Sequence, residues 1–226
     1  MYYRNLYNDK KITKEDYKFI TFGGDGGTYD IGFQSLSGAL ERGHDFTYFC
    51  YDNNAYMNTG IQRSSATPRF ADTTTSPAGK AVPGKQQNRK DLTSVMVNHH
   101  LPYVAQSAIT QNFKDLSEKA EKAIYTEGPC FLNVLAPCPR GWRYNQDELL
   151  TISQIAVDTC FWPLYEVVDG EYHLTYKPKE KKPIEEWLKI QGRFKHVLND
   201  PEKVAEIQAE VDRRWAELLK LCGEEE

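Results

Sequence analysis

The sequence predicts an α/β fold built around a doubly wound parallel sheet. Segments with the period of strands alternate with segments with the period of helices along most of the chain. A glycine-rich loop around Asp25 separates the first strand-like segment from the first helix-like segment, which is the order found in a βαβ unit. The chain has 226 residues, 40% of them hydrophobic, and is therefore long enough to bury one sizeable core and carry a smaller extension.

A strand, a helix and a second strand make up the first predicted unit. Residues 17–22 are mostly aromatic and apolar and indicate a strand, and apolar residues then recur at helical spacing over residues 30–40. Gly43 ends that helix, and residues 46–51 are aromatic and β-favouring, as expected of a buried parallel strand. The polar segment 52–90 follows, and a loop this long inside a compact domain is usually either functional or disordered.

The alternation of strands and helices resumes after this loop. In order, we expect a strand, a helix, a strand, a helix and two final strands at residues 103–108, 114–126, 130–136, 148–160, 164–168 and 171–176. Asp169 and Gly170 separate the last two strands, and Asp-Gly is a strong hairpin signal. After Asp200 the apolar residues recur at steps of three and four, which predicts an amphipathic helix packed on this domain or on a partner subunit. Its apolar face comprises Val204, Ile207, Val211, Trp215 and Leu218.

The charge balance and the hydropathy pattern exclude two classes of partner. The formal net charge is -4 and no long basic stripe offsets it, so we expect no nucleic-acid partner. No segment approaches the roughly 20 apolar residues that a membrane span needs, and the start of the sequence lacks the apolar stretch of a signal peptide. We therefore expect a soluble, cytoplasmic protein without a membrane partner.

The five cysteines form no Cys-x-x-Cys pair and show no closely spaced zinc pattern. An odd number of thiols in a chain of this length argues against a disulfide framework. Cys50 and Cys130 lie within apolar runs, where a thiol usually acts as a small buried hydrophobe.

The glycine loop has the position of a phosphate-binding loop. It lies where a strand ends and a helix begins, so backbone N–H groups and the helix dipole favour a phosphate there. The loop fails the dinucleotide fingerprint, because Tyr29 stands where that motif needs its third glycine. Asp25 would repel a diphosphate unless a cation lies between them, so the loop predicts a metal site.

Magnesium prefers oxygen ligands, usually one or two protein groups together with phosphate oxygens and water. Asp25 supplies one such oxygen, and the asparagine-containing segment 51–60 after the next predicted strand can supply others. Neighbouring parallel strands deliver their carboxyl ends to the same crevice, so the two segments should meet. The alternative is a tight turn in which Asp25 only caps the helix and the asparagines serve turn geometry.

These two segments carry a resemblance to a known family. A Gly-Asp-Gly loop followed by an Asn-containing strand end resembles the cation and diphosphate motif of thiamine diphosphate enzymes. The sequence of residues 24–32 and 51–64 is similar to that of the beta subunit of pyruvate or 2-oxoisovalerate:ferredoxin oxidoreductases. The similarity continues through residues 73–77 and 136–142. It covers nearly the whole chain.

The resemblance implies a thiamine-diphosphate-binding fold that is incomplete at its N-terminus. We accordingly divide the chain into residues 1–160, a partial thiamine-diphosphate-binding domain, and residues 161–226, a C-terminal extension consisting of a hairpin and a helix.

The resemblance also implies roles for individual residues. The metal ligands would be Asp25 and Asn53 through their side chains and Ala55 through its carbonyl; the diphosphate would lie on Gly24, Gly26 and Gly27; and Asn58 and Thr59 would lie near the reacting atoms. Asn58 is the catalytic candidate, because it would lie beside the thiazolium and the substrate. Its alternative reading is a turn residue whose side chain caps its own loop.

Cys138 is the one thiol with a functional interpretation. The resemblance implies that it is the last ligand of a [4Fe-4S] cluster, which needs four thiolates. The family's other three cysteines lie in the N-terminal part of the subunit and include a Cys-x-x-Cys pair that this sequence lacks. The glutamate that activates the cofactor belongs to that same part. The alternative is an ordinary thiol that follows a strand.

The function implied by the resemblance is oxidative decarboxylation of a 2-oxoacid, most simply pyruvate, to acyl-coenzyme A, with electrons passing through the cluster to ferredoxin. The implied partners are alpha-, gamma- and delta-type subunits. We expect no activity without the N-terminal part and these subunits. Two alternatives stay open: an inactive cofactor-binding remnant, and a non-oxidative thiamine diphosphate decarboxylase or synthase, against which the Cys138 segment argues.

Overall fold

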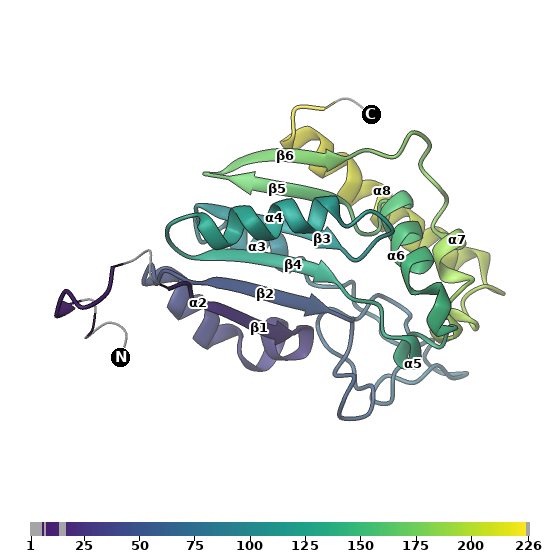
Figure 1. Ribbon diagram of the computed structural model, residues 1–226. Helices are drawn as coiled ribbons and strands as arrows, with labels where there is room; N and C mark the ends of the chain where they lie inside the picture. Colours follow the sequence, from purple (N-terminus) through teal and green to yellow (C-terminus); the bar gives the residue numbers. More distant parts are fainter. Residues whose placement is uncertain (1–5, 7, 14–16, 225–226) are drawn as a thin grey trace.

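The computed structural model describes residues 6, 8–13 and 17–224, and its central feature is one six-stranded sheet (Figure 1). The strand order is β1-β2-β4-β3-β5-β6; the first four strands are parallel, and β5 and β6 are antiparallel. The predicted α/β class with a parallel sheet is confirmed, and the hairpin adds an antiparallel edge. The strands are β1 (Ile20–Gly24), β2 (Thr47–Asp52), β3 (Tyr103–Ala108), β4 (Cys130–Leu135), β5 (Leu164–Val168) and β6 (Glu171–Tyr176).

Helices lie on both faces of the sheet, as in doubly wound folds, and cover the central strands β3 and β4 on both sides. On one face, α4 (Lys114–Tyr125) packs on β3 and β4. On the other face lies the larger hydrophobic core, to which α2 (Phe33–Glu41), α3 (Leu92–Val97) and α8 (Pro201–Leu221) contribute. Every residue of β3 and β4 is buried, because these central strands are covered on both sides.

The structure describes six further helical elements. They are the π-helix η2 (Gly26–Ile31), α5 (Pro139–Trp142), η3 (Gln146–Glu148), α6 (Leu149–Asp158), α7 (Glu185–Leu188) and η4 (Gly192–Phe194). The sequence patterns did not predict α3, α5 or α7, because four to six residues are too few to show a helical period.

The C-terminal helix α8 confirms the predicted apolar stripe. Pro201 occupies its first turn, and the Asp200 carboxylate accepts a hydrogen bond from the Lys203 amide, which caps the helix. The buried residues of α8 are Ile207, Val211, Trp215, Leu218 and Leu219, whereas Val204 is only half-buried. The helix packs on this chain's own core.

The predicted hairpin is also confirmed. Asp169 and Gly170 have φ values of 49° and 89°, the left-handed pair that a tight two-residue hairpin turn requires. Because β5 pairs with β3, the hairpin of segment 161–226 continues the sheet that the preceding residues build.

The first βα unit differs in detail from the prediction. The strand expected at residues 17–22 is β1 at Ile20–Gly24, and the helix expected from residue 30 begins only at Phe33. The intervening residues form η2, in which the Gly32 amide donates to the Gly27 carbonyl at 2.7 Å across five residues. Gly26 and Gly27, which we expected in a loop, therefore belong to a π-helical turn.

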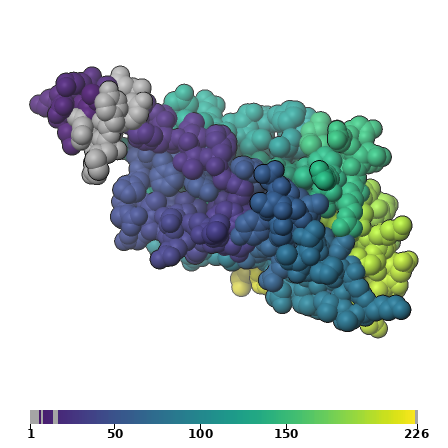
Figure 2. Space-filling model, turned by 90° about the horizontal axis from the view of Figure 1, so that it is seen from below, coloured from purple at the N-terminus to yellow at the C-terminus, as the bar shows by residue number. Residues whose placement is uncertain are grey.

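Residues 53–91 contain turns and isolated bridges but no named helix or strand. The segment lies at the carboxyl ends of β1 and β2 and on the surface beside the purple N-terminal region (Figures 1 and 2). In the ranges that the structure describes, no helix has the length and apolar character needed to cross a membrane.

Candidate metal and diphosphate site

The predicted metal ligands come together at the carboxyl ends of two neighbouring strands. Asp25 directly follows β1, and Asn53 and Ala55 follow β2. The parallel register pairs Gly24 with Tyr51, so the segments after β1 and β2 leave the sheet at the same level. The Asp25 and Ala55 side chains are buried, and Asn53 is half-buried.

Three oxygen atoms converge between these residues. The Asn53 amide oxygen faces the Ala55 carbonyl oxygen and Asp25 Oδ1, with each contact 2.8 Å long. Rotating the amide by 180° would make both contacts hydrogen bonds from Nδ2, whereas a cation would use all three oxygens as ligands. Octahedral Mg²⁺ with ligand distances near 2.1 Å sets neighbouring oxygens roughly 3 Å apart. The donor set therefore fits Mg²⁺.

The electrostatics of Asp25 favour the same occupant. Burial raises the pKa of Asp25 well above its ordinary value, and the neighbouring Asp52 raises it further. Two hydrogen bonds lower this pKa: one from the Ser64 hydroxyl, at 2.5 Å from Oδ2, and one from the Asn53 backbone N–H. A divalent cation would supply the positive charge that this carboxylate lacks.

The glycines of the loop have distinct reasons for lacking a side chain. A Cβ at Gly26 would lie 2.4 Å from the Tyr56 ring, so close packing against this ring requires glycine. A Cβ at Gly24 would lie 3.2 Å from the Tyr51 ring. Gly27 is exposed, and nothing lies within 4 Å of the Cβ position, so its backbone is open to an approaching group. Open backbone beside a carboxylate site suits a metal-bound diphosphate.

In the described residues, no hydrogen bond joins Asn58 or Thr59 to the oxygen atoms of Asp25, Asn53 and Ala55. Both are exposed in a turn that the Gly60 and Ile61 amides close onto the Met57 carbonyl. The Thr59 hydroxyl donates to Gln62 Oε1 at 2.6 Å, so its hydrogen bond serves the turn itself. Their proposed role beside the reacting atoms remains a prediction.

Cys138 lies in the loop after β4, as the N-cap residue of α5, and is half-buried. No group of three or more His, Cys, Asp or Glu side chains placed to hold a metal occurs within the described ranges. Cys130 is fully buried at the opposite end of β4, and Cys50 is buried in β2. A cluster at Cys138 would therefore require thiolates from outside these ranges.

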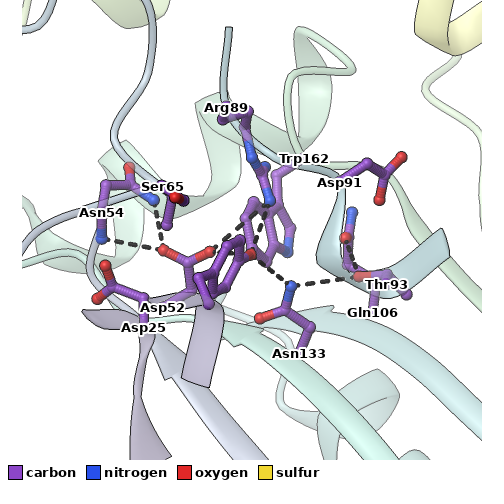
Figure 3. Close-up of polar contacts among 12 residues, drawn as sticks. Asp25, Asp52, Asn54, Ser65, Arg89, Asp91, Thr93, Gln106, Asn133 and Trp162 are labelled. Atoms are coloured by element: carbon purple, nitrogen blue, oxygen red, sulfur yellow. Dashed lines mark hydrogen bonds and ion pairs between the residues drawn. The ribbon is translucent and has the colours of Figure 1, made fainter. Parts of the chain in front are cut away.

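A buried hydrogen-bond network surrounds Asp52, next to Asp25 (Figure 3). The sequence patterns did not reveal this network. The Tyr29 hydroxyl donates to Asp52 Oδ2 at 2.5 Å, and Arg89 forms an ion pair with the same oxygen at 3.7 Å. The Asn54 backbone and side-chain N–H groups donate to Oδ1 at 2.9 and 2.6 Å. Asn133 from β4 donates to the Tyr29 hydroxyl at 2.9 Å.

The loop after β2, which contains Asn53, Asn54 and Ala55, is also held from the C-terminal side. The Trp142 indole N–H donates to the Asn53 carbonyl at 2.8 Å, and Arg193 donates to Asn54 Oδ1 at 3.1 Å. Arg193 is buried against the Trp142 ring, 3.9 Å from its centroid. These contacts hold Asn54 in a left-handed conformation with φ of 65°. The sequence patterns did not indicate these contacts of Trp142 and Arg193.

Comparison with known protein families gives one domain match. Residues 10–134 match the model described as "Thiamine pyrophosphate enzyme, C-terminal TPP binding domain". The match spans the glycine loop, the loop after β2 and β4 up to Val134.

Curated relatives match over nearly the whole chain. Pyruvate synthase subunit PorB of Thermotoga maritima is 52% identical over 97% of this chain and 68% of its own length. Pyruvate synthase subunit PorB of Methanocaldococcus jannaschii is 49% identical over 97% of this chain and 70% of its own length. Ketoisovalerate oxidoreductase subunit VorB of Pyrococcus horikoshii is 44% identical over 94% of this chain and 68% of its own length.

A solved structure shares the fold. The 2-oxoglutarate:ferredoxin oxidoreductase from Magnetococcus marinus, solved with 2-oxoglutarate, coenzyme A and succinyl-CoA, aligns with a TM-score of 0.50 and 21% identity. The alignment covers 67% of this chain and 56% of that chain. At 21% sequence identity, this similarity shows a shared fold and nothing further.

Proposed function

Because this chain belongs to the family of PorB-type oxidoreductase subunits with a thiamine pyrophosphate-binding domain, we propose that it holds Mg²⁺ and thiamine diphosphate for oxidative decarboxylation of pyruvate. The observation that carries the proposal is the convergence of Asp25, Asn53 and Ala55 oxygens beside an open glycine backbone. The identity of about half to pyruvate synthase subunits supports pyruvate as the 2-oxoacid.

In this proposal Asp25, Asn53 and the Ala55 carbonyl hold the metal, and Gly24, Gly26 and Gly27 form the surface against which the diphosphate lies. The buried charges around the site support an anionic ligand. Lys85, Arg89 and Arg193 outnumber the buried carboxylates Asp25 and Asp52. Bound Mg²⁺ adds two more positive charges, so a diphosphate completes the balance.

When bound, thiamine diphosphate supplies the electron sink that decarboxylation of a 2-oxoacid requires. The chain's own contribution is to fix the metal, orient the diphosphate and keep the carboxylates of the site fully bonded. Asn58 and Thr59 would orient the substrate from the adjacent turn. Cys138 would ligate a [4Fe-4S] cluster together with cysteines outside the described ranges.

The remaining parts of the proposed reaction lie outside this chain. Coenzyme A would accept the acyl group, ferredoxin would accept the electrons, and alpha-, gamma- and delta-type subunits would complete the enzyme. Support for these partners comes from the PorB relatives, which are named as subunits, and from the structural neighbour with bound coenzyme A. This chain spans 68–70% of the length of the first PorB relatives.

The test is calorimetric titration of the chain with thiamine diphosphate in the presence and absence of Mg²⁺. We expect binding only with the metal, and Asp25→Asn should weaken it by roughly 100-fold or more, because the variant removes a buried charge that faces the cation. Asp169→Asn is the matched control, since asparagine suits the same left-handed turn position. Unchanged affinity in Asp25→Asn, or full affinity without divalent metal, would refute the site.

A further inference from the structure

The segment 53–91 contains a buried lysine. Lys85 is 2% exposed, although it belongs to a surface segment without helices or strands. Its ammonium donates to the carbonyl oxygens of Ser64, Ser65 and Thr67 at 3.4, 3.2 and 2.5 Å. All three acceptors belong to one tight turn, so the lysine binds this turn as a cation binds a carbonyl cage.

A buried ammonium without a carboxylate partner costs free energy. Among the ion pairs of the described residues, none includes Lys85. Burial lowers the pKa of Lys85 to about 7, and the nearby cations Arg63 and Arg89 act in the same direction, against weaker opposing effects of Asp30 and Asp52. Within the part of the chain that the structure describes, no ion pair therefore offsets the charge of the protonated Lys85.

The turn that Lys85 holds contacts both halves of the metal site. The Ser64 hydroxyl donates to Asp25 Oδ2 at 2.5 Å, and the Thr67 hydroxyl donates to the Asn54 carbonyl at 2.6 Å. The Ser64 amide in turn donates to the Thr67 hydroxyl at 3.0 Å, which closes the turn. Displacing the turn would release the Asp25 carboxylate and the loop that contains Asn53 and Ala55.

We propose that Lys85 is a positioning residue that fixes the Ser64 to Thr67 turn against the metal site and whose charge is neutralised only when an anionic, metal-bound diphosphate occupies the site. The inference rests on the proposed function for its ligand. It adds a residue that no sequence pattern indicated, and it adds a measurable proton linkage.

The linkage has a definite sign. In the free chain Lys85 loses its proton as pH rises through about 7. The bound Mg²⁺ and diphosphate together carry a net negative charge, which favours the ammonium and raises its pKa, so binding at pH 8 should increase the protons held by Lys85. Affinity attributable to this residue should therefore fall as pH rises from 7 to 9. An arginine at this position stays charged over that range and should show neither effect.

The experiment is calorimetry of Mg²⁺–thiamine diphosphate binding at pH 8 in buffers with different ionisation enthalpies, which counts the protons taken up. Lys85→Met should lower affinity roughly 10-fold or more, as expected for a group that supports metal ligands, and should abolish the uptake. Lys85→Arg should restore most of the affinity without restoring the uptake. Lys80→Met, at an exposed position in the same segment, should behave as wild type.

Hydrogen exchange of the Ser64 to Thr67 amides, measured without ligand, separates this inference from the proposed function. If wild type binds the cofactor and Lys85→Met binds it equally well, the positioning role is wrong while the function stands. If wild type does not bind, the function is wrong; faster exchange in Lys85→Met but not in Lys80→Met would then still support the positioning of the turn. Unchanged exchange in Lys85→Met would overturn the role in either case.

Discussion

Asp25 and Asp52 are both buried at the carboxyl ends of adjacent strands, but their partners differ. Asp52 accepts hydrogen bonds from the Tyr29 hydroxyl and from Asn54 and has Arg89 as its counter-ion. Among the described residues, Asp25 accepts hydrogen bonds from the Ser64 hydroxyl and, at 3.3 Å, from the Asn53 backbone N–H, and no cationic side chain is bonded to it. Only Asp25 therefore has coordination capacity left for a metal, which explains at the level of single residues where the cation would lie.

Cysteine ligation is also decided at the residue scale. In the assembled enzyme, Cys138→Ser should lose or convert the [4Fe-4S] cluster, whereas Cys130→Ser should retain it. Cys138 is half-buried in a loop, while burial raises the pKa of Cys130 to about 12 and so disfavours the thiolate that iron requires. Iron content and the EPR spectrum of the reduced enzyme provide the measurement. A wild-type signal in Cys138→Ser with loss in Cys130→Ser would show that the other thiol is the ligand.

At the scale of elements, the π-helix η2 gives the glycine loop its shape. Its wide turn places Gly26 under the Tyr56 ring and leaves Gly27 facing open space. Gly26 therefore allows close packing, whereas Gly27 leaves the backbone accessible.

Two matched substitutions test this division. Gly26→Ala should destabilise the fold by about 1–3 kcal/mol, because its methyl group overlaps the Tyr56 ring. Gly27→Ala should unfold at the wild-type temperature but bind Mg²⁺–thiamine diphosphate more weakly, since its methyl group stands where the diphosphate would approach. Thermal denaturation and calorimetry of both variants provide the comparison. Equal stability of the two variants, or unaltered binding by Gly27→Ala, would contradict the assignment.

At the scale of the whole molecule, the sheet is unevenly covered. Helix α4 packs on β3 and β4, whereas within the described ranges no helix covers β1 and β2 on that side (Figure 1). Ile20, Phe22 and Tyr51 are 42%, 68% and 47% exposed there, and Phe22 stacks on Phe49 at a centroid distance of 5.1 Å. An apolar face beside an open strand edge favours association with another polypeptide.

We predict that this chain alone does not oxidise 2-oxoacids and associates through the β1 face. Its occupant in the working enzyme would be the polypeptide that corresponds to the part of the PorB relatives not spanned here. Anaerobic pyruvate-dependent reduction of a viologen dye with Mg²⁺, thiamine diphosphate and coenzyme A measures the activity. It should be absent for this chain and appear only when the partner subunits and further cysteine ligands for the cluster are supplied; turnover by the chain alone would refute the prediction.

Light scattering tests the surface itself. Phe22→Lys should reduce oligomerisation of the purified chain, because it places a charge at the centre of the exposed face. Phe113→Lys alters a similarly exposed aromatic residue, 51% exposed at the start of α4, and should leave oligomerisation unchanged. The same reduction in both variants would indicate general solubilisation and not a specific face.

The strands and long helices could be predicted because their signals are local. The bounds of β3, β5 and β6 match the sequence pattern residue for residue, since alternation and buried apolar runs are properties of consecutive residues. The Asp-Gly hairpin and the apolar stripe of α8 depend on equally short-range rules. The same local reasoning predicted that Asp25 and the segment after β2 would meet, because parallel strands share a carboxyl edge.

Only the tertiary structure decided what surrounds these residues. Ser64, Lys85 and Arg193 reach the site from 39, 60 and 168 positions beyond Asp25, in segments where polar residues gave no sign of burial. Ser64 contacts Asp25, Arg193 contacts Asn54, and Lys85 contacts the turn that contains Ser64. These contacts arise from the folding of an irregular segment and of the C-terminal extension over the sheet. Periodicity records which side of an element faces the core, but it carries no information about which distant side chains will share that core.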